Sequence, residues 1–401
     1  MSAQKPIEEQ NSGKEFDIHD PAFARDPYAT YDRLRTKCPV KHSALHGGIW
    51  LLSRYEDVRN AAIDWRTFTS SVPGVTAIPI ITRRTEPQLP LELDPPLHSR
   101  YRALVNPVFS AARIEELRPR VTAMATRLIS QLLEQGGGDL VPDYAVPLSV
   151  ETMAEFTGLP KHDSGLWVGW IRRMFDVAHP ADSERASHEF GMYIDDLIRR
   201  RRAAPCGDFV SLLMESEVEG HHLTDPEIHS FCTLLFGAGF ETTADALSVM
   251  LYHLAEHPEN RHRLAAEPDL IPTAVEEFLR YISPIQIFGR NATRDVTLDG
   301  QTIPKGDVVA LSFASANHDP NVFSDSEECI LDRTPNRHLA FGAGIHFCLG
   351  APVARLEMAI TLEEFSRRVK GLKLAEGNAV KWKTRGDRRG LETLPVVIAG
   401  A

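Results

Sequence analysis

The stretch Phe341-Gly342-Ala343-Gly344-Ile345-His346-Phe347-Cys348-Leu349-Gly350 places one cysteine in a glycine-bearing loop. A helical pattern with a proline in its first turn, Ala351-Pro352-Val353-Ala354-Arg355-Leu356-Glu357, follows directly. We therefore expect Cys348 close to a helix N-terminus, where unpaired amides and the positive end of the helix dipole favour a thiolate. The glycines allow the loop to fold tightly and to turn amides towards the sulfur. A thiolate held in this way suits a soft or borderline metal ion.

A simpler interpretation also exists, because a lone cysteine is usually an inert buried thiol and a lone Gly-x-Gly is a weak motif. The combined spacing Phe-Gly-x-Gly-x-His-x-Cys-x-Gly, however, resembles the haem-ligand loop of the cytochromes P450. This resemblance implies that Cys348 is the axial ligand of a haem iron. It also implies that Phe341, Gly342, His346 and Gly350 lie around the haem.

The composition is that of a large soluble globular chain of 401 residues, of which 43% are hydrophobic and 25% charged. A net charge of −11 argues against nucleic acid and against an anionic membrane surface as partners. The five cysteines are scattered without a Cys-x-x-Cys pair, which disfavours disulfides, zinc sites and iron–sulfur clusters and favours a cytoplasmic location. Residues 1–17 are expected to form a disordered tail and residues 18–401 a single domain.

Helical patterns dominate the chain, and strand patterns are few and short. Helices are predicted over residues 28–37, 55–64, 97–109, 111–135, 150–158, 183–202, 225–257, 274–281 and 351–369. Strands are predicted over residues 49–53, 296–298 and 308–311, with a turn at 301–305. The fold class is therefore mainly α with small β sheets. The proline-rich segment 72–96 is expected to be a long functional loop.

The longest predicted helix, 225–257, begins at a capping box formed by Thr224 and Glu227. Gly237 and Gly239 stand in its middle, and each destabilises a helix by about 1 kcal/mol relative to alanine. We infer that a flat or bulky group packs against this point.

Glu241 places a carboxylate in the buried centre of this helix, which is unfavourable unless the group serves protons or has a partner. A satisfied glutamate at a local kink is the alternative. The run Ala238-Gly239-Phe240-Glu241-Thr242-Thr243 resembles the oxygen-binding groove of the cytochromes P450. The resemblance implies that Glu241 and Thr242 deliver protons to dioxygen and that Ala238 and Gly239 lie against the haem. It leaves open whether Thr243 shares the hydroxyl role.

Glu277 and Arg280 have the i, i+3 spacing of a helix ion pair. They resemble the Glu-x-x-Arg motif of the same family, and Arg333 matches its third member. These three residues are expected to support the cysteine loop rather than to act in catalysis. The neighbouring Glu276 is expected to be solvated.

The two propionates of a haem need cations when they are partly buried. His98 and Arg102 lie at i and i+4, on one face of a predicted helix that resembles the propionate-binding helix of the family. Arg290 and His346 match two further propionate partners of the family.

The resemblance extends from Asp94 to the C-terminal helix and favours soluble bacterial members of the camphor-hydroxylase type. It implies the cytochrome P450 fold as a single haem-thiolate domain, haem b as cofactor, and a monooxygenase that uses O2 and two electrons. No flavin or ferredoxin pattern follows in the chain, so we expect the electrons from a ferredoxin or flavodoxin with its reductase. Candidate docking residues are Arg100, Arg337, Arg367 and Arg368. The protein is expected to be a monomer.

A small-to-medium apolar substrate, of the terpenoid kind, is expected in an apolar pocket. The resemblance places in its lining Val75, Ile78, Ile80, Leu235, Ala238, Ile285, Ile287 and Phe288. A carboxylate clamp at Arg83 and Arg84 would instead suit a fatty or aromatic acid. A peroxide-driven peroxygenase and a haem sensor without turnover are further alternatives, and neither would need the pair Glu241 and Thr242.

Overall fold

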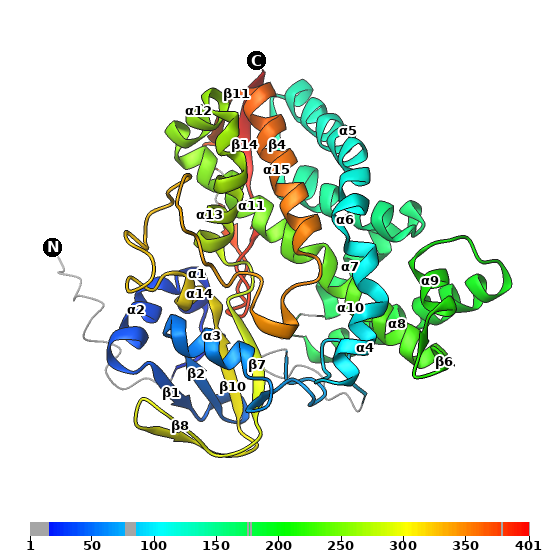
Figure 1. The fold of residues 1–401 in the computed structure, drawn as a ribbon. Helices are drawn as coiled ribbons and strands as arrows, with labels where there is room; N and C mark the ends of the chain where they lie inside the picture. The colour runs from blue at the N-terminus through cyan, green and yellow to red at the C-terminus, as the bar shows by residue number, and fades with distance from the viewer. Residues whose placement is uncertain (1–15, 77–85, 175, 177–178, 378–379, 401) are drawn as a thin grey trace.

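The computed structural model describes residues 16–76, 86–174, 176, 179–377 and 380–400 (Figure 1). Residues 1–15 of the predicted tail lie outside this range. Phe16, near the end of that tail, is buried and packs edge-on against Phe23, with ring centroids 5.1 Å apart. The packed chain therefore includes a residue that the sequence analysis assigned to the tail.

The described chain is mainly helical, as predicted. Its α-helices are α1 (Pro21–Arg25), α2 (Tyr28–Lys37), α3 (Tyr55–Ile63), α4 (Leu97–Val105), α5 (Ala111–Gln135), α6 (Val146–Thr157), α7 (Ser164–Met174), α8 (Pro180–Ala203), α9 (Phe209–Glu215), α10 (Asp225–Gly239), α11 (Glu241–Glu256), α12 (Pro258–Ala266), α13 (Ile271–Ile282), α14 (Phe313–Asn317) and α15 (Ala351–Arg368). Shorter turns are the 3₁₀ segments η2 (Leu45–Gly47), η3 (Asn106–Phe109), η5 (Lys161–Asp163), η6 (Pro268–Leu270) and η7 (Gly344–His346) and the π-helical η4 (Val141–Ala145).

The largest sheet has five strands in the order β1-β2-β10-β7-β3, in which only β2 and β10 run parallel. A three-stranded antiparallel sheet has the order β11-β14-β4, and three two-stranded ribbons complete the described strands. The strands are β1 (Val40–Ser43), β2 (Ile49–Leu52), β3 (Phe68–Thr69), β4 (Gly137–Asp139), β5 (Glu217–Val218), β6 (His221–His222), β7 (Ile287–Ala292), β8 (Val296–Leu298), β9 (Gln301–Ile303), β10 (Val308–Ser312), β11 (Val369–Leu374), β12 (Lys381–Trp382), β13 (Leu391–Thr393) and β14 (Pro395–Gly400).

Helix α11 is the centre of the helical part and packs against α6, α13 and α15, while the five-stranded sheet lies to one side with α2, α3 and α14 (Figure 1). Twelve of the 16 residues of α11 are buried. By length and composition, Asp225–Glu256 is the only described helical segment that could cross a membrane, but 72% of its most apolar stretch is buried inside the protein. Burial of this kind is typical of the core helix of a globular protein.

The helix predicted over 225–257 is divided at Phe240 into α10 and α11. Its capping box is confirmed, because the Thr224 amide donates to Glu227 Oε2 over 2.8 Å and the Glu227 amide donates to Thr224 Oγ1 over 3.4 Å. Gly239 lies where α10 passes α6, since a Cβ there would overlap the terminal methyl of Met153. Part of the close approach inferred for the two glycines is therefore made by a protein side chain.

The turn predicted at 301–305 is wrong for its first residues. Gln301–Ile303 form β9, which pairs antiparallel with β8. The turn lies instead at Asp299 and Gly300, which have φ of +48° and +73°. Asp-Gly with positive φ at both positions is typical of a two-residue hairpin, so this dipeptide was the sequence feature that marked the turn.

Candidate active site

The cysteine loop, residues 341–350, contains the short turn η7 and leads into α15. Gly342 and Gly344 both have φ of +70°, a left-handed conformation that glycine adopts without strain. At Gly344 a side chain would also press on α3, because an added Cβ would lie 3.1 Å from the Ile63 Cα. The Cys348 amide donates to the Phe341 carbonyl oxygen over 2.9 Å, which closes the loop.

The sulfur of Cys348 lies at the N-terminal end of α15, as predicted. Gly350 is the N-cap of this helix, and Pro352 stands in its first turn. The Cys348 side chain is accessible, but protein surrounds it at longer range, and this burial raises the pKa of the thiol. Hydrogen bonds from the Gly350 and Ala351 amides lower the pKa again, as does the charge of Arg102. The loop therefore offers amides and a positive charge to a thiolate.

One face of the α10–α11 junction carries Ala238 and Thr242, one helical turn apart. Ala238 is exposed, and Thr242 is partly exposed and donates from Oγ1 to the Ala238 carbonyl oxygen over 3.1 Å. Thr243, in contrast, is buried on another side of the helix. The accessible hydroxyl at this junction is therefore that of Thr242.

Glu241 does not share this open face but lies in a buried ion cluster with the C-terminal segment. Its Oε1 accepts from Lys383 Nζ over 2.9 Å, its Oε2 accepts from Arg388, and Lys383 also lies 2.8 Å from Asp245 Oδ1. Burial alone would raise the pKa of Glu241, but Arg388 and Lys383 hold this pKa well below its usual range. Gly390 permits the approach, because a Cβ there would overlap the Asp245 carboxylate.

Sequence reasoning missed the partners of Glu241. The basic run Lys383-Thr384-Arg385-Gly386-Asp387-Arg388-Arg389 was the only feature that could have suggested them. Nothing in that run shows which of its cations turns inward, since ordinary basic runs are solvated.

The four predicted propionate ligands converge. The His98 and His346 rings meet edge to face with centroids 4.5 Å apart, and Arg102 donates to the Phe347 carbonyl oxygen over 2.6 Å. Burial, followed by the charges of Arg290, His98 and Arg102, lowers the pKa of His346 to about 2. Four groups able to carry positive charge thus lie within electrostatic reach of one another.

No carboxylate of the described chain is in direct contact with these four groups, and Asp94 acts on Arg290 and His98 only at longer range. Within the described chain, both ring nitrogens of His98 and Nε2 of His346 are buried without a hydrogen-bond partner, and no carboxylate pairs with Arg102 or Arg290. Burial lowers the pKa of Arg290 to about 10, and the charge of Asp94 offsets this effect only in part. Two propionates would supply the missing acceptors and charge, so the residues present fit a haem.

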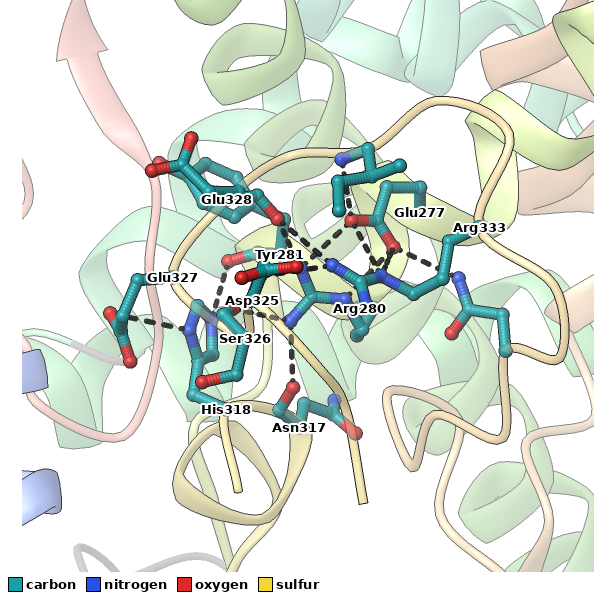
Figure 2. A network of polar contacts seen from close by, with 12 residues as sticks. Glu277, Arg280, Tyr281, Asn317, His318, Asp325, Ser326, Glu327, Glu328 and Arg333 are labelled. Carbon is teal, nitrogen blue, oxygen red and sulfur yellow. Dashed lines mark hydrogen bonds and ion pairs between the residues drawn. The ribbon is translucent and has the colours of Figure 1, made fainter. Parts of the chain in front are cut away.

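Glu277, Arg280 and Arg333 form one buried network (Figure 2). The Glu277 carboxylate accepts from Arg280 Nε and Nη2, each over 2.8 Å, and from Arg333 Nε over 3.0 Å. The two guanidinium groups also donate to backbone carbonyl oxygens of Asn317, Ser324, Asp325, Ser326 and Glu328. The network therefore fastens α13 to the segment that leads into the cysteine loop.

The predicted pocket lining is only partly supported by the structure. Ile78 and Ile80 lie outside the described residues. Ile287 was predicted wrongly, because it is buried in the cluster of Ile18, Tyr31 and Leu51. The cause is the alternation of side chains along a strand: Arg290 lies over the Phe288 ring, so these two share one face of β7 and Ile287 takes the other.

The remaining predicted lining residues are Val75, Leu235, Ala238, Ile285 and Phe288. Val75 is fully buried, whereas Leu235, Ile285 and Phe288 are partly buried at the edges of apolar clusters and Ala238 is exposed. Partly buried apolar residues of this kind are available to a ligand.

Comparison with known proteins agrees with this geometry. The family model "Cytochrome P450" matches residues 166–371. Mycinamicin IV hydroxylase/epoxidase of Micromonospora griseorubida is 38% identical over 87% of this chain and 89% of its own length. Vitamin D(3) 25-hydroxylase of Pseudonocardia autotrophica is 35% identical over 96% and 97%. The solved structure of cytochrome P450 PksS from Bacillus subtilis 168 superposes with a TM-score of 0.87 at 34% identity, covering 96% of this chain and all of that one.

The chain therefore belongs to the cytochrome P450 family. It is a monooxygenase, and its cofactor is haem b, which members of the family bind through a cysteine thiolate. As a bacterial-type member, it works with redox partner proteins, an organic substrate and O2.

Proposed function

We propose that this protein inserts one oxygen atom from O2 into a small-to-medium apolar organic substrate of the terpenoid kind. Two observations support the proposal. The amides of Gly350 and Ala351 are directed at the sulfur of Cys348, and the cluster of His98, Arg102, Arg290 and His346 has buried imidazole nitrogens without partners and no carboxylate in direct contact within the described chain. Cys348 is the axial ligand in this proposal. His98, Arg102, Arg290 and His346 hold the propionates, and Phe341, Gly342, Ala238, Gly239 and Gly350 line the haem.

When bound, the haem supplies the activation of dioxygen for attack on a C–H or C=C bond. The chain itself must deliver protons and exclude water. Thr242 carries the accessible hydroxyl, and its donation to the Ala238 carbonyl leaves the oxygen lone pairs free to accept. Glu241 is the acid of the pair, kept ionised by Lys383 and Arg388. Proton supply through Glu241 therefore requires one of these ion pairs to loosen.

The apolar character of Val75, Leu235, Ile285 and Phe288 supports an apolar substrate. The relatives named as hydroxylases or epoxidases carry the names of different molecules, mycinamicin IV, vitamin D(3) and cyclomarin C. Arg83 and Arg84, on which an acidic substrate would depend, lie outside the described residues.

We propose that the electrons come from a ferredoxin or flavodoxin with its reductase, and that the protein is a cytoplasmic monomer. Of the predicted docking residues, Arg100 and Arg367 are paired with Glu219 and Glu364, and Arg368 donates to a serine hydroxyl. Arg337 is exposed without a described acidic partner and is the best supported contact for an acidic protein.

The carbon monoxide difference spectrum of the reduced holoprotein tests the role of Cys348. We expect the red-shifted Soret band of a thiolate-ligated haem in the wild type and in Cys206→Ser, an exposed control, and its loss in Cys348→Ser. Retention of that band in Cys348→Ser would refute the assignment. Product formation with hydrogen peroxide alone, at the rate of the full redox chain, would favour the peroxygenase instead.

A further inference from the structure

Glu276, expected to be solvated, is instead held by two other segments. Arg355 of α15 donates from Nε to Glu276 Oε1 over 2.7 Å and from Nη2 to Oε2 over 2.8 Å. His338 Nε2 lies 3.1 Å from the same Oε2. Burial alone would raise the pKa of Glu276, but these hydrogen bonds and charges lower it to about 2. A two-point contact between a guanidinium and a carboxylate fixes the orientation of both groups.

The ion pair between Glu276 and Arg355 forms a bridge that holds the first residues of the cysteine loop in place. The Arg355 guanidinium lies over the Phe341 ring, 4.7 Å from its centroid, and His338 Nδ1 accepts from the Ala340 amide over 3.2 Å. Phe341 is the residue whose carbonyl oxygen accepts from the Cys348 amide. The chain of contacts therefore runs from Glu276 through Arg355 and Phe341 to Cys348.

Arg355 also stands on α15, the helix whose N-terminal end carries the sulfur of Cys348. Its guanidinium lies against the start of the cysteine loop, so its charge acts on the Cys348 thiolate through space. Arg102, the other cation near the sulfur, is itself one of the proposed propionate ligands. Arg355 is therefore the cation near the sulfur that can be changed with the propionate ligands left in place.

We propose that Arg355, oriented and partly neutralised by Glu276, is a positioning residue that sets the reduction potential of the haem through its charge near the Cys348 thiolate. The inference rests on the proposed role of Cys348 as the iron ligand. Adding one electron to the haem makes the ligated site more negative, and a nearby cation stabilises the more negative state. Glu276 opposes this effect because its negative charge lies against the same guanidinium.

Arg355 and Glu276 carry opposite charges, so removing one or the other should shift the reduction potential in opposite directions. Arg355→Met removes the cation and should shift the potential to a more negative value. Glu276→Gln leaves the cation without its neutralising partner and should shift the potential to a more positive value. Arg355→Lys keeps the charge but loses the planar two-point contact, so its potential should lie nearer to the wild type than that of Arg355→Met. In the double variant Glu276→Gln/Arg355→Met the shifts should largely cancel.

The experiment is a spectroscopic redox titration of each holoprotein at fixed pH and salt, with the thermal midpoint measured in parallel. The matched control is the exposed pair Arg127 and Glu151, which joins α5 to α6 with Nη2 2.6 Å from Oε1; Arg127→Met and Glu151→Gln should leave the potential unchanged. A bridge that only stabilises the loop would lower the thermal midpoint in both single variants and move their potentials in the same direction or not at all.

Potentials of Arg355→Met and Glu276→Gln that move in the same direction, or that do not move, would overturn the inference, whatever the thermal midpoints show. The assignment of Cys348 as the iron ligand and the role of Arg355 and Glu276 can be refuted independently. If Cys348→Ser keeps the thiolate-type carbon monoxide band, the assignment of the ligand is wrong. If that band is lost while the potentials of Arg355→Met and Glu276→Gln do not diverge, only the role of Arg355 and Glu276 is wrong.

Discussion

Replacing Glu277 with glutamine should destabilise the whole domain, because one carboxylate serves two buried guanidinium groups (Figure 2). Glu277 and Arg280 are fully buried, and the Arg333 side chain is 7% exposed. Breaking a buried ion pair by removing one partner costs about 3–5 kcal/mol, since the remaining charge stays buried without compensation. The NH2 group of the glutamine would also face an N–H group of a guanidinium, so two hydrogen-bond donors would oppose each other.

This energy corresponds to a measurable shift in the thermal midpoint. Unfolding entropy of about 2.1 cal/mol/K per residue gives roughly 0.8 kcal/mol/K for 401 residues, so the midpoint should fall by about 4–6 °C. Calorimetry or circular dichroism of the holoprotein measures it, and haem retention should fall as the loop loosens. The control is Glu328→Gln, whose backbone carbonyl joins the same network while its side chain is exposed. Equal midpoints for the two variants would refute the reasoning.

Thr242→Ala should lower the product formed per reducing equivalent consumed while Thr242→Ser preserves it; an unchanged ratio would count against the proton role of the hydroxyl. Lys383→Met should lower stability by about 3 kcal/mol, because the buried carboxylates of Glu241 and Asp245 lose a shared cation, and an unaltered thermal midpoint would contradict this. Glu276→Gln should be less stable than the wild type near neutral pH. Because the pKa of Glu276 falls from 4.5 to about 2 on folding, its stabilisation is present above about 4.5 and is lost as the pH falls towards 2. The difference in unfolding free energy should therefore shrink over that interval, and a constant difference would contradict the assignment.

Helices with strong local patterns were predicted well. The bounds of α2 and α5 were predicted correctly at both ends, and α5 stops at Gly136, which has φ of +72° and serves as a left-handed C-cap. In contrast α7, α12 and strands β7, β11 and β14 were not predicted. Their stability depends on partners far along the chain, as when β14 pairs with both β4 and β11. Local propensity is weak in such segments, and packing decides them.

In the candidate site, too, features that depend on local sequence were predicted, whereas features that depend on distant segments were not predicted from the residues alone. The positions of Cys348, Gly342 and Gly344 follow from spacing within one loop, because glycine conformation and the start of a helix are local properties. The clustering of His98, Arg102, Arg290 and His346 was expected only through family resemblance, since the residues come from three distant segments.

The sequence by itself determined the class of fold, the glycine-bearing cysteine loop before α15, the capping of α10 and the family, all of which depend on residues close together in the chain. Only the tertiary structure decided that Lys383 and Arg388 hold Glu241, that Arg355 holds Glu276, and that Ile287 faces away from the site. The physical reason is that an ion pair between residues 142 or 147 positions apart, or the side of a strand that is covered, depends on how distant segments pack. The order of charged residues along the chain does not show which distant residue will neutralise a given charge.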